Sequence, residues 1–184
     1  QQPGHAPRRV SARINFTVKA PQAKARGRSP RFAIAIVRPT IVVGDSRTGE
    51  TTQVTGLGET VEKLWRGRLP ALAGRADTWL PLITVDHLAA FTATVCDDEA
   101  TLGGQLVALD PTTPLLPDLI ARVAAHLGVE PPRLRLPTGL VAALPRTLTG
   151  IEPENLSFLV ADRYDARSAE AHARAAGVVA PPLD

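Results

Sequence analysis

The amino-acid sequence predicts an α/β fold, in which short strands of a parallel sheet are separated by helices. Three observations lead to this class. Residues 32–37 and 103–109 are short apolar segments of the kind that form buried strands in parallel sheets. Segments with helical periodicity lie between them, and the clearest helix follows the second strand. Because a parallel sheet needs more than two strands, we expect this chain to hold the C-terminal part of such a fold, with the N-terminal strands upstream.

The first strand, Phe32–Val37, is rich in isoleucine and is followed directly by Arg38-Pro39. Pro39 has no N–H group to donate to a neighbouring strand, so regular pairing is expected to end there. The next residues, Gly44–Gly49, have the composition of a loop.

Two helices are predicted between the strands. The first begins near Gly58 and ends at Gly67, since glycine suits the left-handed conformation past a helix end. The second follows a brief extended segment at residues 83–85, and Thr84 or Asp86 can cap its first turn. Their apolar faces comprise Val61, Leu64 and Trp65 in the first helix, and Leu88, Phe91 and Val95 in the second.

The clearest helix follows the second strand and is expected to pack on the sheet. Pro117 suits its first turn and Gly128 its C-terminal end. Residues 131–145 are rich in proline, with room for one short helix. Asp165 can cap a last helix that ends at Gly177. The apolar stripe of the clearest helix comprises Leu119, Ile120, Val123 and Leu127.

Charge divides the chain at about residue 31. Residues 1–31 contain eight of the 21 Lys and Arg residues and none of the 18 Asp and Glu residues. Such a segment could be a nucleic-acid-binding arm. It contains only one aromatic residue, Phe16, and matches no docking motif, so no nucleic-acid partner is expected. We interpret residues 1–31 as a basic, flexible leader and residues 32–184 as the folded domain.

Other sequence features bound the class of protein. No apolar run approaches 18 residues, so no membrane span is expected. The single cysteine, Cys96, excludes an internal disulfide framework, fits a reducing compartment and predicts a cytoplasmic location. The four histidines are scattered and are expected at the polar surface or at helix ends, with no metal site. The sequence contains no methionine, so a fragment or a processed product is expected.

Four segments occur in an order that resembles a known family: IAIVRPTIVVGDSRTGE, LPLITVDHLAAF, GGQLVALDPTTPLLPDLIARVAAHLG and DRYDARSAEAHARAAGVVAPPL. Over roughly residues 32–183 the chain is similar to the C-terminal half of an extended short-chain dehydrogenase/reductase. The male-sterility-type fatty acyl reductases and thioester reductase domains are the most similar members. The resemblance implies a Rossmann-type NAD(P)-binding fold and the NAD(P)H-dependent reduction of a thioester or acyl group.

The resemblance also implies which residues form the site. The strand would reach the cofactor, so that Arg38, Pro39, Thr40 and Ile41 line the nicotinamide end of NADP or NAD. The loop residues Ser46, Arg47 and Thr48 would lie on the side of an acyl or thioester substrate. Taken without the family, Pro39 only ends a strand and the loop is only a turn. Asp86 is interpreted as a cap of its own helix, and Ser46 has no histidine at a spacing that suggests a hydrolase nucleophile.

Two features of the family are absent from this sequence. The first is a Gly-rich phosphate loop, because GLGET at residues 56–60 is too short and follows the Arg-Pro strand. We interpret it as a helix N-terminus. The second is the Tyr-x-x-x-Lys pair. Lys19, 19 residues before Arg38, matches the catalytic lysine, but Asn15 occupies the tyrosine position. An amide has no titratable proton and cannot act as the acid.

Three hypotheses remain open for the function. The chain is part of an NAD(P)-dependent oxidoreductase, truncated and inactive by itself. Alternatively, it is a non-catalytic remnant or accessory module that keeps the fold. The third hypothesis is a nucleic-acid-binding protein that uses the basic leader, for which salt-dependent binding would have to vanish without residues 1–31.

Overall fold

A computed structural model of the chain describes residues 16–20, 33–52, 56–143, 156, 159 and 163–182. The strands are β1 (Phe16–Ala20), β2 (Ala33–Pro39), β3 (Ile41–Val43), β4 (Ala71–Ala73), β5 (Leu82–Thr84), β6 (Gln105–Ala108) and β7 (Leu134–Leu136). The helices are α1 (Leu57–Trp65), α2 (Val85–Asp97), α3 (Leu116–Leu127), α4 (Thr138–Ala143) and α7 (Arg167–Ala175), with a 3₁₀ turn, η1, at Glu99–Thr101.

The main sheet has the strand order β1-β2-β6. β2 pairs with β6 in parallel, from Ile36 opposite Gln105 to Pro39 opposite Ala108. The predicted parallel pairing of the two apolar segments is therefore confirmed. The long connection between them carries α1 and α2, as a parallel pair requires.

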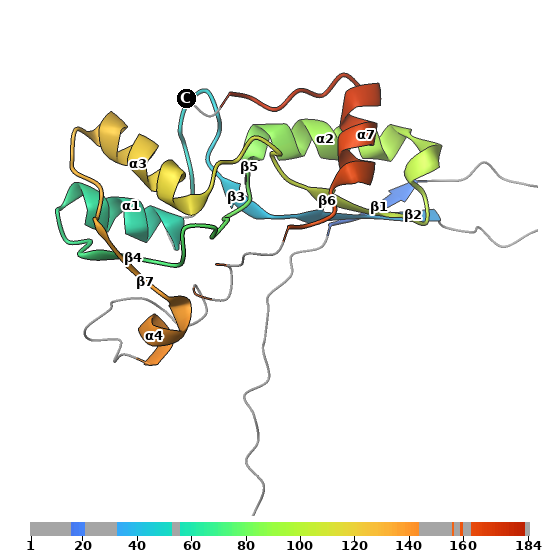
Figure 1. The fold of residues 1–184 in the computed structure, drawn as a ribbon. Helices are drawn as coiled ribbons and strands as arrows, with labels where there is room; N and C mark the ends of the chain where they lie inside the picture. The colour runs from blue at the N-terminus through green and yellow to red at the C-terminus, as the bar shows by residue number, and fades with distance from the viewer. Residues whose placement is uncertain are drawn as a thin grey trace, which may run out of the picture.

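Helices α2 and α7 cover one face of this sheet (Figure 1). Ala35 and Val37 of β2 have no solvent exposure and pack against the predicted stripe of α2. The opposite face of β2 is more open, with Ile34 40% exposed. The core cluster between the sheet and the two helices comprises Ala35, Val37, Ile83, Leu88, Phe91, Val95, Leu106, Ala108 and Ala169.

Helix α3 lies elsewhere, and the expectation that it packs on the main sheet is wrong. Its bounds and its Gly128 end are as predicted, with φ of 67° at Gly128. Its buried face, however, joins a second core cluster with α1, β4 and the β3–β5 pair. Periodicity identifies which face of a helix is buried but not its partner. This second cluster is built around Leu64, Leu72, Leu80, Leu82, Leu116, Leu119, Ile120 and Ala124.

Two further details differ from the sequence prediction. Trp65, expected on the buried face of α1, is 62% exposed at the end of that helix, and Leu64 alone of its residues is buried. Strand β1 lies within the basic segment and pairs antiparallel with β2. The other residues of the predicted leader, 1–15 and 21–31, lie outside the described residues, and the domain boundary near residue 31 stays a prediction. Among the described residues, no helix has the length and apolar character that crossing a bilayer requires.

Candidate functional site

The segment predicted to contact a nicotinamide lies at the carboxyl end of β2, next to the end of β6. Thr40 donates its N–H to the carbonyl oxygen of Ala108 at 3.0 Å, and its hydroxyl lies 3.3 Å from the same oxygen. Contrary to the expectation from sequence, pairing with β6 continues through Pro39. After Thr40 the chain changes partner, because Ile41 donates its N–H to Pro81 and β3 pairs with β5. Open α/β sheets bind ligands at this edge.

Three buried side-chain polar atoms lack hydrogen-bond partners among the described residues. They are Nε of Arg38, near the end of β2, Oδ2 of Asp110, just after β6, and Oγ1 of Thr84, at the end of β5. Asp110 is 2% exposed, and its other oxygen, Oδ1, accepts bonds from the N–H and hydroxyl groups of Thr112. Unsatisfied buried polar atoms are costly and are concentrated at functional sites. No sequence motif singles out Asp110.

The predicted substrate-side loop is held by Asp86. The N–H of Ser46 donates to Oδ1 of Asp86 at 3.0 Å, and the Ser46 hydroxyl donates to Oδ2 at 2.7 Å. These bonds, with the Ser46 hydroxyl contributing most, hold the pKa of Asp86 well below its usual range. The interpretation of Asp86 as the cap of its own helix is wrong: Thr84 precedes α2, and Asp86 lies in the first turn.

The sheet topology explains why residues 40 positions apart meet. Ser46 follows β3, Asp86 follows β5, and the two strands are parallel neighbours. Their carboxyl ends therefore lie at one edge, where Val85 also donates its N–H to Gly44 at 3.4 Å. The two motifs VVGDSRTG and TVDH, which carried the family resemblance, are thus in direct contact.

The loop itself is closed by Asp45. Its Oδ1 accepts the N–H groups of Arg47 and Thr48 at 2.9 and 3.0 Å, which lowers the pKa of the Asp45 carboxyl, the Arg47 bond being the larger cause. Gly44 is required by close packing, since a Cβ there would lie 2.7 Å from the carbonyl oxygen of Glu50. Arg47 and Thr48 are exposed, and among the described residues neither lines one of the two pockets.

Lys19 is not brought to this site. It lies on β1, opposite Ile34 of β2, whereas the resemblance implies a helix for the catalytic pair. Arg38 lies four positions after Ile34 along β2, which at about 3.3 Å per residue is roughly 13 Å. The structure therefore groups Arg38–Ile41 with Ser46–Thr48 on consecutive segments but leaves Lys19 at the other end of β2.

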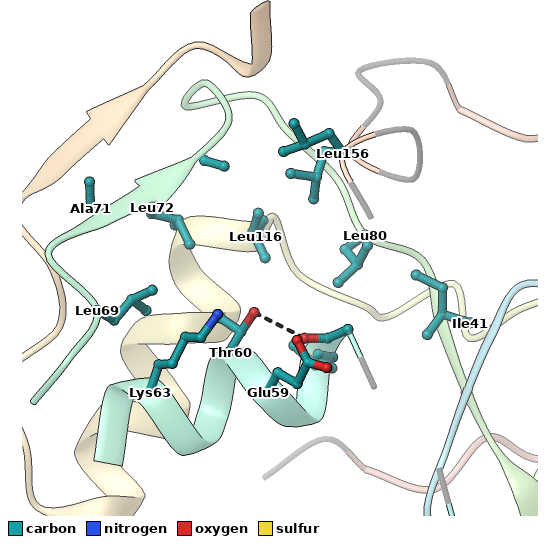
Figure 2. A pocket seen from close by; sticks show the side chains of 14 residues that line it. Ile41, Glu59, Thr60, Lys63, Leu69, Ala71, Leu72, Leu80, Leu116 and Leu156 are labelled. Atoms are coloured by element: carbon teal, nitrogen blue, oxygen red, sulfur yellow. Dashed lines mark hydrogen bonds between the residues drawn. The ribbon is translucent and has the colours of Figure 1, made fainter. Parts of the chain in front are cut away.

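An apolar pocket lies beside Ile41, between α1, α3 and β4 (Figure 2). Lys63 and Glu59 of α1 lie on its polar side, and the Thr60 hydroxyl donates to the carbonyl of Gly56 at 3.1 Å. GLGET is a helix N-terminus, as predicted, with Gly56 preceding α1 at φ of 68°. The pocket volume, about 100 Å³, is well below the roughly 300–1,000 Å³ of typical ligand sites.

Sequence reasoning missed a polar network on α7. His172, whose side chain is 7% exposed, places Nδ1 3.0 Å from Oδ2 of Asp98 and Nε2 3.0 Å from the Thr94 hydroxyl. His172 and His87 both lie in terminal turns of helices, as expected, but both are buried rather than at the surface. Within the described part of the chain, no group of three or more His, Cys, Asp or Glu side chains could hold a metal ion.

Comparison with known proteins supports the resemblance. The family model described as Male sterility protein, an NAD-binding family, matches residues 22–92. No curated protein sequence matches the chain. Several chains of solved structures match its fold, and three of them are described next.

The terminal R domain of the myxalamid PKS-NRPS biosynthetic pathway is 18% identical, with a TM-score of 0.58 over 82% of this chain and 40% of that one. The protein gox2253 is 22% identical, with a TM-score of 0.52 over 79% and 44% of the two chains. The human epimerase family protein SDR39U1, solved with NADPH, is 18% identical, with a TM-score of 0.51 over 74% and 41%.

These findings show the fold that the chain resembles. The chain has an α/β fold like part of a Rossmann-type NAD(P)-binding domain, similar to the short-chain dehydrogenase/reductase-like structures above. The similarity to the male-sterility-type proteins that the sequence indicates is confirmed over residues 22–92. The chain spans about two fifths of the length of the solved structures that it matches.

Proposed function

We propose that this chain supplies the nicotinamide side and the substrate-side loop of an NAD(P)H-dependent reductase acting on a small acyl or thioester substrate. The observation that carries the proposal is the buried, unpartnered Nε of Arg38 at the carboxyl end of β2. A polar group of a cofactor at this edge would satisfy it. The family match and the NADPH in a structural neighbour support the nicotinamide cofactor.

Each segment would have a distinct task. Arg38, Pro39, Thr40 and Ile41 would form one wall for the nicotinamide, with Pro39 fixing the backbone where the chain leaves β2. Ser46, Arg47 and Thr48 would face the acyl group, held in place through the bonds from Ser46 to Asp86. The bound cofactor would supply a hydride.

The residues fit the nicotinamide end of the cofactor but not its pyrophosphate. A pyrophosphate site uses the N–H groups of a helix N-terminus after a Gly-rich turn, and the sequence has no such turn after a strand and before a helix. General acid catalysis is typically worth about 10²–10⁴-fold, and Asn15 cannot supply it. We therefore expect the 184-residue chain alone to bind NADPH weakly and to reduce no carbonyl substrate, whether it is part of an enzyme or a module without activity.

Titration with NADPH and with reduced nicotinamide mononucleotide, followed by NMR, tests the proposal. Both ligands should shift the amide signals of Thr40 and Ile41. The Arg38→Ala variant should lose these shifts, and Arg133→Ala, which alters an exposed arginine on another segment, should retain them. If the Thr40 and Ile41 signals were unchanged at saturating mononucleotide, the proposed contact between Arg38–Ile41 and the nicotinamide would be refuted.

Calorimetry distinguishes the remaining hypotheses. A dissociation constant for NADPH in the low micromolar range would contradict the expectation that the pyrophosphate site is missing. If that binding also disappeared in Lys19→Ala, Lys19 would be part of the cofactor site and its match to the family lysine would be supported. Reduction of an acyl thioester by the chain alone would overturn the assignment of Asn15 to the tyrosine position.

A further inference from the structure

A second cavity lies on the face of the main sheet that α2 and α7 cover, next to the end of β6 that pairs with Arg38 and Pro39. It has a volume of about 390 Å³, within the range of small-molecule sites. Its walls come from α2, the end of β6, α7 and the segment at residues 177–180. None of Arg38–Ile41 or Ser46–Thr48 lines it. The cavity therefore adjoins the site described above without sharing the residues predicted for it.

The one strongly buried polar side chain in this cavity is His87. It lies in the first turn of α2 and is 8% exposed. Among the described residues, neither of its ring nitrogens has a hydrogen-bond partner. His172, the other buried histidine, has partners for both nitrogens. The ring nitrogens of His87 are not among the fully buried atoms that lack a partner, so they stay accessible from the cavity. A bound molecule in the cavity would supply the missing partner.

The other walls set the chemical class of that molecule. Phe91, Val107, Ala173 and Val178 give the cavity an apolar lining. Helix α7 contributes one acidic and one basic residue, Glu170 and Arg174, whose opposite charges favour neither an anion nor a cation.

The remaining polar group, the Thr112 hydroxyl, already donates to Asp110 at 2.7 Å. An ionic group bound between these walls would lose its hydration. Because Glu170 and Arg174 carry opposite charges, the walls offer no net charge to compensate for that loss.

We propose that this cavity binds a small, uncharged, apolar molecule with one hydrogen-bonding oxygen, an alcohol, aldehyde or ketone, and that His87 bonds to that oxygen. The apolar body of the ligand contacts Phe91 and Ala173, and the imidazole fixes its orientation. The site needs no nicotinamide cofactor, so its test is independent of the proposed reductase function.

Three aromatic probes of nearly equal shape test this assignment on the 184-residue chain. Benzyl alcohol carries the neutral oxygen, toluene lacks it, and benzoate carries a charge. We expect benzyl alcohol to shift the ring signals of His87 and Phe91 in NMR spectra, with a dissociation constant on the order of 1 mM for so small a molecule. Toluene should bind about tenfold more weakly, since it leaves the imidazole without a partner. Benzoate should bind no more tightly than toluene.

Two variants locate the binding and its polar contact. His87→Phe keeps an aromatic ring, and should weaken benzyl alcohol about tenfold while leaving toluene unchanged. His126→Phe, which alters an exposed histidine of α3, is the matched control and should change neither. Ala173→Phe should fill the cavity and abolish binding of both probes.

The comparison of probes on the unaltered chain does not depend on how the variants fold. Equal affinities for toluene and benzyl alcohol would overturn the role of His87. Tightest binding by benzoate would overturn the uncharged class. Binding that survives Ala173→Phe in a folded variant would place the ligand outside this cavity. Absence of shifts at His87 and Phe91 with all three probes would refute the site.

Discussion

The Asp86→Ala substitution tests the tether that positions the substrate-side loop. It removes both acceptors of Ser46, at 3.0 Å for the N–H and 2.7 Å for the hydroxyl. Hydrogen bonds to a charged group contribute about 1.5–3 kcal/mol when shielded from water. Because the Asp86 carboxylate is largely open to solvent, we expect about 1 kcal/mol for the two bonds together. That corresponds to roughly a fivefold increase in the open population of the loop.

Amide hydrogen exchange measures this opening directly. Exchange of the Ser46 N–H should accelerate about fivefold in Asp86→Ala, and the melting temperature should fall by about 2–4 °C. Asp97→Ala, at the other end of α2, is the matched control, because Asp97 is exposed and no bond to it is seen within the described segments. A double-mutant cycle with Ser46→Ala and Asp86→Ala measures the free energy of the bond between the Ser46 hydroxyl and Asp86. It separates this bond from the effect of the Asp86 charge on the first turn of α2. Unchanged Ser46 exchange in Asp86→Ala would refute the tether.

The acid dependence of the same tether has a definite sign. The pKa of Asp86 is lowered in the folded chain, so its contribution to stability is present above the ordinary carboxyl pKa of about 3.9 and is lost as the pH falls through the folded value. Protection of the Ser46 N–H should therefore be constant between about pH 5 and 8 and decline only in stronger acid. In Asp86→Asn that decline should be absent.

Other substitutions test the packing around the two sites. Gly44→Ala places a Cβ 2.7 Å from a backbone oxygen and should lower the free energy of unfolding by about 1–3 kcal/mol, whereas Gly139→Ala, with no atom within 4 Å, should not lower it; urea denaturation compares them. His172→Ala should cost about 2–3 kcal/mol, and a cycle with Asp98→Ala should give a coupling above 0.5 kcal/mol, while additive effects would contradict the contact. Phe91→Ala should cost about 3–5 kcal/mol by calorimetry, and a smaller loss would show that the core collapses around it.

Local signals in the sequence were sufficient for the elements of the main core. The apolar run of β2 and the stripe of α2 depend only on apolar residues at strand or helix spacing. Ala35, Val37 and the stripe of α2 are buried as predicted, whereas Ile34 is 40% exposed. The end of α3 at Gly128 follows from the conformational freedom of glycine, which here has φ of 67°. These features are fixed by neighbouring residues along the chain.

Features that join distant segments could not be predicted in this way. The stripe of α3 shows that one face is buried, but not that its partners belong to the second core cluster. The bond between Asp98 and His172 joins residues 74 positions apart and leaves no pattern in the sequence. Asp86 resembled a helix cap, because its tie to Ser46 depends on β3 and β5 being neighbours.

The Arg38-Pro39 pair within an apolar stretch has a structural explanation. Ile36 and Thr40 donate their N–H groups to Gly104 and Ala108, on the β6 side of the strand. Because successive residues of a strand alternate their hydrogen-bonding direction, the missing N–H of Pro39 would point away from β6. On that side β1 pairs only as far as Val37, and the next bond is from Ile41 to Pro81.

On the side away from β6, Pro39 lies between Val37, the last residue paired with β1, and Ile41, which donates to Pro81, so no donor is needed there. Pro39 cannot donate a backbone hydrogen bond on this side of the strand. The side chain of the adjacent Arg38 has a buried Nε without a bond among the described residues. Buried polar atoms in proteins are normally hydrogen-bonded. The chain changes partner from β6 to β5 directly after this pair, at the carboxyl end of the strands, which is the edge where open α/β sheets bind ligands.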